Sequence, residues 1–370
     1  MKNIYVAATS QHVGKTTSTL GLVALMKNLG IKVGYCKPVG QQFVDLRDLR
    51  VDKDALLFSD VMQFELDSQL HSPVILGRGA TEAYLDAPND FKHYRKGILQ
   101  AKTALEKHNE LVIYEGTGHP GVGSVVDLSN AEVAKILEAG VIMVVEGGVG
   151  STIDKLNLSL AEFEQKGVPI IGVIINKIRT DKIAKVENYV GKWLKKKGLP
   201  LLGTLPYDPS LAYPLMRTVV KAIRGEVICN KKSLNNKVRD FISGSLIEMN
   251  KLEGSEDLLL VAGARRVGQA IFKIKRMSEK MGISGTPLAG IIATGEGELE
   301  EESMEYIKKH KVPLVRTMLD TFGCVIRISR IEVKINLSTP WKVKKAIELI
   351  SENVDPERIL EQVSLNEVEE

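Results

Sequence analysis

Cysteine is scarce in this sequence of 370 residues, and its three copies stand far apart, at Cys36, Cys229 and Cys324. No two of them have the Cys-x-x-Cys spacing, so the sequence indicates neither a zinc site nor a disulfide framework. Long apolar runs are lacking as well. The apolar run at 4–8 is too short for a signal peptide, and no run of about 18 apolar residues could span a membrane. These absences predict a cytoplasmic protein with no membrane partner.

A strong charge of one sign is also absent. The chain has 50 basic and 46 acidic residues, and its formal net charge of +4 is small for a chain of this size. Nucleic-acid binding requires basic residues gathered on one face, whereas the lysines at 195–197 are expected at the solvated end of a helix. Nucleic acid is therefore not an expected partner. The hydrophobic content of 44% predicts a globular protein with a substantial core.

Short apolar runs alternate with segments of helical spacing over the first 205 residues. The apolar runs lie at 4–8, 33–36, 111–114, 141–145, 169–175 and 201–205. Between them, the segments at 16–30, 131–140 and 181–198 have helical spacing and each ends in a glycine, as helices often do. This alternation predicts βαβ units, and hence an α/β fold in which helices cover both faces of a parallel sheet.

A change of composition marks the end of this region, because residues 206–214 contain three prolines. The strand and helix patterns resume at 258–263, and Thr339 with Pro340 forms the expected start of a last helix. We expect a first domain at 1–215, a linker at 216–229, a second, smaller α/β domain at 230–352, and an acidic C-terminal tail at 353–370.

The string TSQHVGKTT, from Thr9 to Thr17, lies between the first predicted strand and the first predicted helix. A loop in that setting binds phosphate with its backbone N–H groups and with the positive end of the helix dipole. Lys15 is expected over the β- and γ-phosphates, and the hydroxyl of Thr16 on Mg²⁺. The string departs from the usual G-x-x-x-x-G-K-[ST] pattern at Thr9. The alternative interpretation is a chance GKT at the start of a helix.

Polar residues also stand at the ends of other predicted strands, where α/β proteins bind ligands. Lys37 ends the second strand, although a solvent-exposed lysine would give the same pattern. Asp52 and Asp54 precede an apolar run, so they are either a helix cap or carboxylates near Mg²⁺. Glu115 ends a buried strand before a glycine-rich loop, a setting that suits Mg²⁺ coordination and close backbone approach to a ligand.

Three further positions are candidates for ligand contacts. Asn176 and Lys177 end another strand, where an asparagine can contact a purine. A guanine-selective loop would have an aspartate two residues after the lysine, but this chain has Arg179, which favours adenine. His119 could contact a substrate or be a structural loop residue. The Arg265–Arg266 pair could bind an anion at a helix start or form a solvated helix turn.

In this order, ATSQHVGKTT, YCKPVG, KDALLF, YEGTGH and the Asn-Lys pair resemble the dethiobiotin synthetase family. The segments HSPVILGRGATEAYLD (71–86) and GHPGVGSVVDLSNAEVAKIL (118–137) are more similar still to the dethiobiotin-synthetase-like domain at the front of long phosphate acetyltransferases. This resemblance covers about residues 1–215. Residues 230–352 resemble the DRTGG domain that follows in those proteins, through the order of strands and helices and DTFGCVIRIS (320–329), although the DRTGG string itself is absent.

The resemblance implies a P-loop NTPase-like fold with ATP and Mg²⁺ as cofactors. Carried over residue by residue, it assigns nucleotide binding to Val13, Gly14, Lys15, Thr16, Thr17 and Asn176, and Mg²⁺ to Thr16, Asp54 and Glu115. Lys15 and Lys37 are the catalytic candidates, since their charges would stabilise a phosphoryl group in transfer. Dethiobiotin synthetases join CO₂ to a diamine, phosphorylate the carbamate with ATP and close a urea ring.

Two departures from the family pattern affect the expected function. The proline–histidine segment with which dethiobiotin synthetases bind substrate and dimerise is not found, and acetyl transfer is not expected because the chain ends at Glu370. The first hypothesis is a nucleotide-dependent regulatory or sensor protein whose partner is an unknown small molecule or a regulated protein. The second is an ATP-dependent carboxylase–cyclase or amide-forming ligase, and the third is slow ATP hydrolysis coupled to dimer rearrangement. A homodimer is implied by the family alone.

Overall fold

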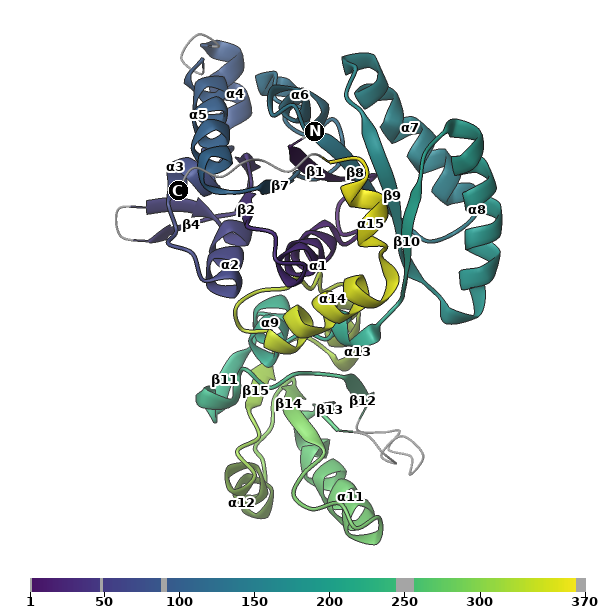
Figure 1. Cartoon of the computed structure of the whole chain (residues 1–370). Helices are drawn as coiled ribbons and strands as arrows, with labels where there is room; N and C mark the ends of the chain where they lie inside the picture. Colours follow the sequence, from purple (N-terminus) through teal and green to yellow (C-terminus); the bar gives the residue numbers. More distant parts are fainter. Residues whose placement is uncertain (1, 47–48, 88–91, 244–255, 364–370) are drawn as a thin grey trace. The chain divides into compact units, whose positions relative to one another are not determined.

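The computed structural model describes residues 2–46, 49–87, 92–243 and 256–363. The chain divides into two units (Figure 1). The first comprises Met1–Asp208 and Ile335–Glu370, and the second comprises Pro209–Lys334. The chain therefore leaves the first unit after β10 and returns to it for its last helices.

A parallel sheet of six strands, in the order β10-β9-β8-β1-β7-β2, forms the centre of the first unit. Its strands are β1 (Asn3–Ala8), β2 (Val33–Cys36), β7 (Leu111–Glu115), β8 (Gly140–Glu146), β9 (Ile170–Ile178) and β10 (Leu201–Pro206). Every residue of β1, β2 and β7 is buried. Burial on both faces explains why these strands are nearly continuous apolar runs in the sequence.

Helices cover both faces of this sheet, and each face has its own hydrophobic core. One face packs against α1 (Lys15–Asn28), α2 (Lys53–Met62), α14 (Pro340–Asn353) and α15 (Pro356–Leu360). The other packs against α5 (His93–His108), α6 (Asn130–Ile136), α7 (Gly150–Lys166) and α8 (Ile183–Lys197). The predicted parallel sheet with helices on both faces is confirmed.

Shorter elements fill the segment between β2 and β7. Two pairs of short strands lie there, β3 (Val39–Gly40) with β6 (Val74–Ile75) in parallel and β4 (Phe43–Leu46) with β5 (Leu49–Asp52) antiparallel. The short helices α3 (Ser68–His71) and α4 (Ala80–Asp86) follow in the same segment. The strands β3, β4 and β5 lie between Lys37, directly after β2, and the start of α2, while α3, β6 and α4 follow α2.

The second unit contains a mixed sheet of five strands in the order β11-β15-β14-β13-β12. The strands are β11 (Glu226–Cys229), which is antiparallel to its neighbour, and the parallel strands β12 (Asp240–Ser243), β13 (Leu258–Gly263), β14 (Leu288–Thr294) and β15 (Leu314–Thr317). Its helices are α9 (Met216–Ile223), α11 (Val267–Lys280), α12 (Glu301–Lys309) and α13 (Thr321–Ser329). The unit has hydrophobic clusters of its own, so the expected second, smaller α/β domain is present.

The boundaries of the units differ from the expected domains. The second unit begins at Pro209, and α9 and β11 occupy the expected linker at 216–229. The helix α14 was expected in the domain at 230–352, but it packs on α1 in the first unit. The expected tail at 353–370 contains α15, whose Ile359 is buried in that unit's core, while residues 364–370 lie outside the described residues. The periodicity of a helix does not say which sheet the helix covers, so the sequence pattern could not place α14.

Backbone contacts attach the returning segment to the edge of the first sheet. Val354 forms an antiparallel bridge with Gly203 in β10. The N–H of Asp355 donates to the carbonyl of Leu202 at 3.0 Å, and a guanidinium N–H of Arg358 donates to the carbonyl of Leu201 at 3.0 Å.

Among the described residues, none of the helices combines the length and the apolar character needed to cross a bilayer.

The contact between α1 and α14 depends on the absence of a side chain at Gly21. An ideal Cβ there would lie 2.3 Å from Cγ1 of Ile350 and 2.9 Å from the carbonyl oxygen of Ala346. We expect Gly21→Ala to lower the free energy of unfolding of the first unit by about 2 kcal/mol, because the two helices would be forced apart. Urea unfolding followed by tryptophan fluorescence measures this, since Trp193 and Trp341 both belong to the first unit.

Gly191 in α8 provides a matched control, because nothing lies within 4 Å of its ideal Cβ. Gly191→Ala should stabilise the unit by up to about 1 kcal/mol, since alanine is the better helix former. Equal effects of the two substitutions would contradict the close packing of α14 on α1.

Candidate functional site

The loop between β1 and α1 is anchored at both ends. The N–H of Thr9 donates to the carbonyl of Val144 at 3.1 Å, which ties the start of the loop to β8. Gly14 is the N-cap of α1 and has φ 109°, in the left-handed region that favours glycine. An ideal Cβ on Gly14 would also lie 2.2 Å from Nδ2 of Asn176. Because Gly14 has no side chain to cap α1, the N–H groups of the first turn suit an anion.

The end of β9 supports this loop through two side chains. Nδ2 of Asn176 donates to the carbonyl of Val13 at 2.7 Å, and its Oδ1 accepts from the N–H of Lys177 at 2.8 Å. Nζ of Lys177 donates to the carbonyl of His12 at 2.6 Å and lies 3.4 Å from Oε1 of Glu146. Asn176 is buried beside the loop, so its observed role is to hold the loop in place. Its expected contact with adenine stays a prediction.

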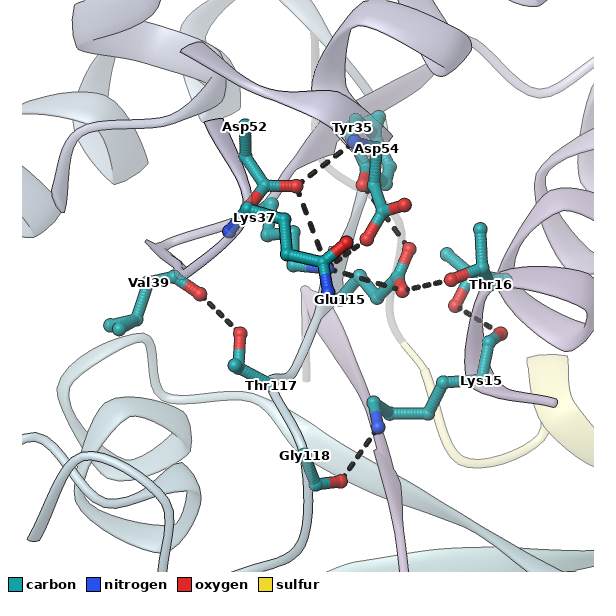
Figure 2. A network of polar contacts seen from close by, with 12 residues as sticks. Lys15, Thr16, Tyr35, Lys37, Val39, Asp52, Asp54, Glu115, Thr117 and Gly118 are labelled. Atoms are coloured by element: carbon teal, nitrogen blue, oxygen red, sulfur yellow. Dashed lines mark hydrogen bonds and ion pairs between the residues drawn. The ribbon is translucent and has the colours of Figure 1, made fainter. Parts of the chain in front are cut away.

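Lys15 and Thr16 connect the loop to β7 and the glycine-rich segment after it. Figure 2 shows Nζ of Lys15 donating to the carbonyl of Gly118, at 2.7 Å. The hydroxyl of Thr16 donates to Oε1 of Glu115 at 2.7 Å. The phosphate loop and the expected metal-binding carboxylate of β7 are therefore in direct contact.

A buried amide holds the glycine-rich segment in place. Nδ2 of Asn130 donates to the carbonyls of Thr117 at 2.8 Å and His119 at 2.7 Å. Its Oδ1 accepts from the N–H of Thr117 at 2.9 Å and from the hydroxyl of Tyr5 at 2.8 Å. These bonds fix the backbone next to Gly118, whose carbonyl receives Lys15. The side chain of His119 itself is exposed.

Lys37 lies among three carboxylates, as Figure 2 shows. Its Nζ forms an ion pair with Asp54 and lies 3.6 Å from Oε1 of Glu115 and 3.7 Å from Oδ1 of Asp52. Lys37 is 6% exposed, and Asp52 and Glu115 are 1% exposed. The hydroxyl of Tyr35 donates to Oε2 of Glu115 at 3.2 Å. One ammonium is thus shared by two buried carboxylates and by Asp54, whose side chain is 16% exposed.

The electrostatics of this cluster favour an added cation. Burial by itself lowers the pKa of Lys37, but the carboxylates of Asp54, Glu115 and Asp52 outweigh burial and raise the pKa. Burial raises the pKa of Glu115 and of Asp52, and the ammonium of Lys37 opposes that rise only in part. Lys37 therefore stays charged, and three carboxyl groups share its ammonium, with a smaller contribution from the ammonium of Lys15 at Glu115. A divalent cation would compensate the excess of carboxyl groups.

Thr16, Asp54 and Glu115 fit the oxygen ligands that Mg²⁺ prefers. The hydroxyl of Thr16 and a carboxylate oxygen of Glu115 are 2.7 Å apart. Asp54 and Glu115 both lie beside the ammonium of Lys37. Within the described part of the chain, no three His, Cys, Asp or Glu side chains are arranged to hold a metal on their own. Mg²⁺ does not need such a cage, because it takes several ligands from water and phosphate oxygens.

The structure brings most of the predicted site residues together at the carboxyl ends of the strands of the first sheet. They are Val13, Gly14, Lys15, Thr16, Thr17, Lys37, Asp54, Glu115 and Asn176. Arg265 and Arg266 lie instead in the second unit, as exposed residues in the short 3-10 helix that precedes α11.

Three residues that the sequence did not single out complete the site. Tyr35 bonds Glu115 and stacks on Phe58 with ring centroids 3.6 Å apart, whereas Tyr5 and Asn130 support the glycine-rich segment. The sequence contained one signal for the tyrosines, because a tyrosine inside an otherwise aliphatic buried strand needs a partner for its hydroxyl. Asn130 carried no such signal, since it follows Ser129, the N-cap of α6, and looks like an ordinary first residue of a helix.

A parallel sheet whose first strand leads through a phosphate-type loop into a helix defines a P-loop NTPase-type domain. Comparison with protein families agrees with this class. The model of the AAA domain family AAA_26 matches residues 2–214, more than half of the chain, so the chain belongs to that family. The model of the DRTGG domain matches residues 218–331.

Curated relatives confirm the expected resemblance. A phosphate acetyltransferase of Synechocystis sp. is 21% identical over 97% of this chain and 51% of its own length. An ATP-dependent dethiobiotin synthetase of Clostridium acetobutylicum is 25% identical over 56% of this chain and 87% of its own length. The chain spans about half the length of the phosphate acetyltransferases that it matches. Among solved structures, the MinD cell division protein of Aquifex aeolicus is 15% identical and covers 57% of this chain and 85% of its own, with a TM-score of 0.37.

The excess of acidic groups predicts a gain in stability when one of them is neutralised. We expect Glu115→Gln to raise the free energy of unfolding of the metal-free first unit at neutral pH by about 1 kcal/mol. Because burial raises the pKa of Glu115, the folded wild type loses stability as the pH rises above the ordinary glutamate value, and the amide does not. The gain should therefore shrink as the pH is lowered. Urea unfolding at several pH values, with a chelator present, measures it.

Glu132 is the control of opposite sign. Burial alone would raise its pKa, but hydrogen bonds from Lys166 and Arg95 outweigh burial and lower it. Glu132→Gln should cause a small loss of stability that disappears at low pH. For Glu115→Gln, a loss of stability at every pH would contradict the prediction. It would show that the hydrogen bonds from Thr16 and Tyr35 to Glu115 outweigh the repulsion between Glu115 and Asp54.

Proposed function

We propose that the first unit binds ATP with Mg²⁺ and that the protein is a nucleotide-dependent regulatory or sensor protein. The observation that carries this proposal is the direct contact between the phosphate loop and the acidic cluster, in which Thr16 bonds Glu115 beside Asp54. The proposal is supported because a loop of the phosphate-binding type and oxygen groups of the kind that Mg²⁺ prefers lie together at the carboxyl ends of the strands, as MgATP binding requires. The proposal includes a cytoplasmic location. It also includes a homodimer, and light scattering measures the mass that tests it.

Each residue of the loop is expected to contact a different part of the nucleotide. The N–H groups from Gly14 to Thr17 would hold phosphate oxygens, and Lys15 would exchange the carbonyl of Gly118 for the triphosphate. Bound Mg²⁺, held by Thr16, Asp54 and Glu115, would neutralise phosphate charge. Adenine is the preferred base, because Arg179 replaces the aspartate of guanine-selective loops. Asn176 has a second amide hydrogen with which it could contact that base.

A regulatory role is supported by the path of the chain. The segment that follows the second unit packs as α14 on α1, and α1 begins at the phosphate loop. A nucleotide that shifts α1 would act on the chain segment leading out of the DRTGG domain. The partner would be an unknown small molecule or a regulated protein.

The proposal predicts that nucleotide binding depends on Lys15. We expect Lys15→Ala to weaken the binding of MgATP at least 100-fold, because the triphosphate would lose its closest ammonium. Isothermal titration calorimetry measures the affinity. Lys196→Ala, which removes an exposed lysine of α8, is the matched control and should bind as the wild type does. Wild-type affinity in Lys15→Ala would refute the assignment of the site.

A second candidate function is an ATP-dependent carboxylase–cyclase or amide-forming ligase of the dethiobiotin synthetase type. The observation that favours it is Lys37, which lies beside Asp54 and Glu115 and close to the end of the loop that carries Lys15. An ammonium in that place could hold a carbamate or a phosphoryl group in transfer.

Phosphate release from MgATP separates the two functions. We expect slow release that diaminopelargonic acid with bicarbonate does not accelerate, because the substrate segment of the biotin enzymes is not found in this sequence. Stimulation of tenfold or more by the diamine would support the ligase and refute a purely regulatory role. Lys15→Ala should abolish release in either case, which makes it the background control.

A further inference from the structure

Asp52 is the residue of the acidic cluster that the expected metal site does not use. It ends β5 and caps α2, and it is 1% exposed, whereas aspartate is almost never fully buried unless it is paired. Its Oδ1 accepts from the N–H of Asp54 at 2.9 Å, and its Oδ2 accepts from the N–H of Gln42 at 3.2 Å. Both carboxylate oxygens are therefore engaged by backbone amides.

The backbone around Asp52 holds it in this position. Its own N–H donates to the hydroxyl of Ser72 at 3.0 Å, and an ideal Cβ on Gly40 would lie 2.6 Å from its Oδ2. Asp52 cannot turn toward a metal without losing these bonds. Its Oδ1 nevertheless lies 3.7 Å from Nζ of Lys37. In Figure 2, Asp52 and Thr16 lie on opposite sides of Lys37 and Glu115.

The three partners of Lys37 thus differ in what they can do. Asp54 and Glu115 can be shared with Mg²⁺, while Asp52 stays committed to the backbone and to Lys37. When a divalent cation draws on Asp54 and Glu115, the buried ammonium needs another counter-charge, because an unpaired buried charge is costly. Asp52 is the group placed to supply it.

We propose that Asp52 is the positioning residue that holds the Lys37 ammonium in the site when Asp54 and Glu115 bind Mg²⁺. This inference rests on the proposed MgATP site. Asp52 acts through Lys37 and contacts neither metal nor nucleotide. Its charge lowers the cost of placing a divalent cation beside the ammonium of Lys37.

The test uses Asp52→Asn in the full chain, because asparagine caps helices as well as aspartate does. The substitution removes the charge and also costs one of the two backbone bonds, and the comparison with and without Mg²⁺ separates these two effects. Calorimetry compares the binding of ATP with Mg²⁺ and of ATP in a chelator. We expect binding with Mg²⁺ to weaken about tenfold and metal-free binding to change less than twofold. Equal changes in both would assign Asp52 to helix capping alone, and no change in either would overturn the proposal. Asp320→Asn, an N-cap variant in the second unit, is the matched control and should match the wild type.

A second measurement shows whether the effect passes through Lys37. Asp52→Asn in a Lys37→Gln background should change MgATP affinity less than twofold, and a full tenfold loss there would overturn the role assigned to Lys37. If Lys37→Gln does not fold, the Mg²⁺-specific loss in Asp52→Asn decides alone, and if Asp52→Asn does not fold, Asp52→Ser takes its place. A wild type that binds no MgATP refutes the proposed function, whereas a binding wild type with an unchanged Asp52→Asn refutes only this inference.

Discussion

The buried ammonium of Lys37, shared by the carboxylates of Asp52, Asp54 and Glu115, is the interaction on which the site of the first unit depends. It joins the end of β2, the start of α2 and the end of β7, three segments that the chain brings together from distant positions. The carboxylates outnumber the ammonium, so the cluster is costly without an added cation. Such stored electrostatic cost is typical of a binding site and not of a core built for stability alone.

Two amide side chains hold the backbone of the phosphate loop and of the glycine-rich segment beside it. Asn176, with Lys177, supports the loop from β9, and Asn130 supports the glycine-rich segment that receives Lys15. Both amides satisfy backbone groups that would otherwise lack partners in a buried place. This arrangement keeps the N–H groups of the first turn of α1 in position before a ligand binds, which reduces the ordering that binding would otherwise require.

The chain leaves the first unit and returns to it, so the second unit is covalently connected to the first at both of its ends. The helix α14 lies against α1 where Gly21 allows close approach, and the segment after it bonds the edge of β10. Both ends of the second unit therefore connect to parts of the first unit that are fixed to its sheet. The domain is an insertion into the first unit and not an appendage after it, which suits the proposed transfer of a signal from the nucleotide site.

The sequence by itself determined the strand–loop–helix order, because that order is encoded in short local patterns. It also predicted Lys15, Thr16, Lys37, Asp54 and Glu115 as site residues, from the phosphate-loop string, from residues that end strands and from the family resemblance. Only the tertiary structure decided that α14 belongs to the first unit, since amphipathic spacing does not identify the sheet that a helix covers. It also decided that Asp52 faces Lys37 and that Asn130 supports the glycine-rich segment. Those roles come from contacts between separate segments of the chain, and local periodicity does not predict such contacts.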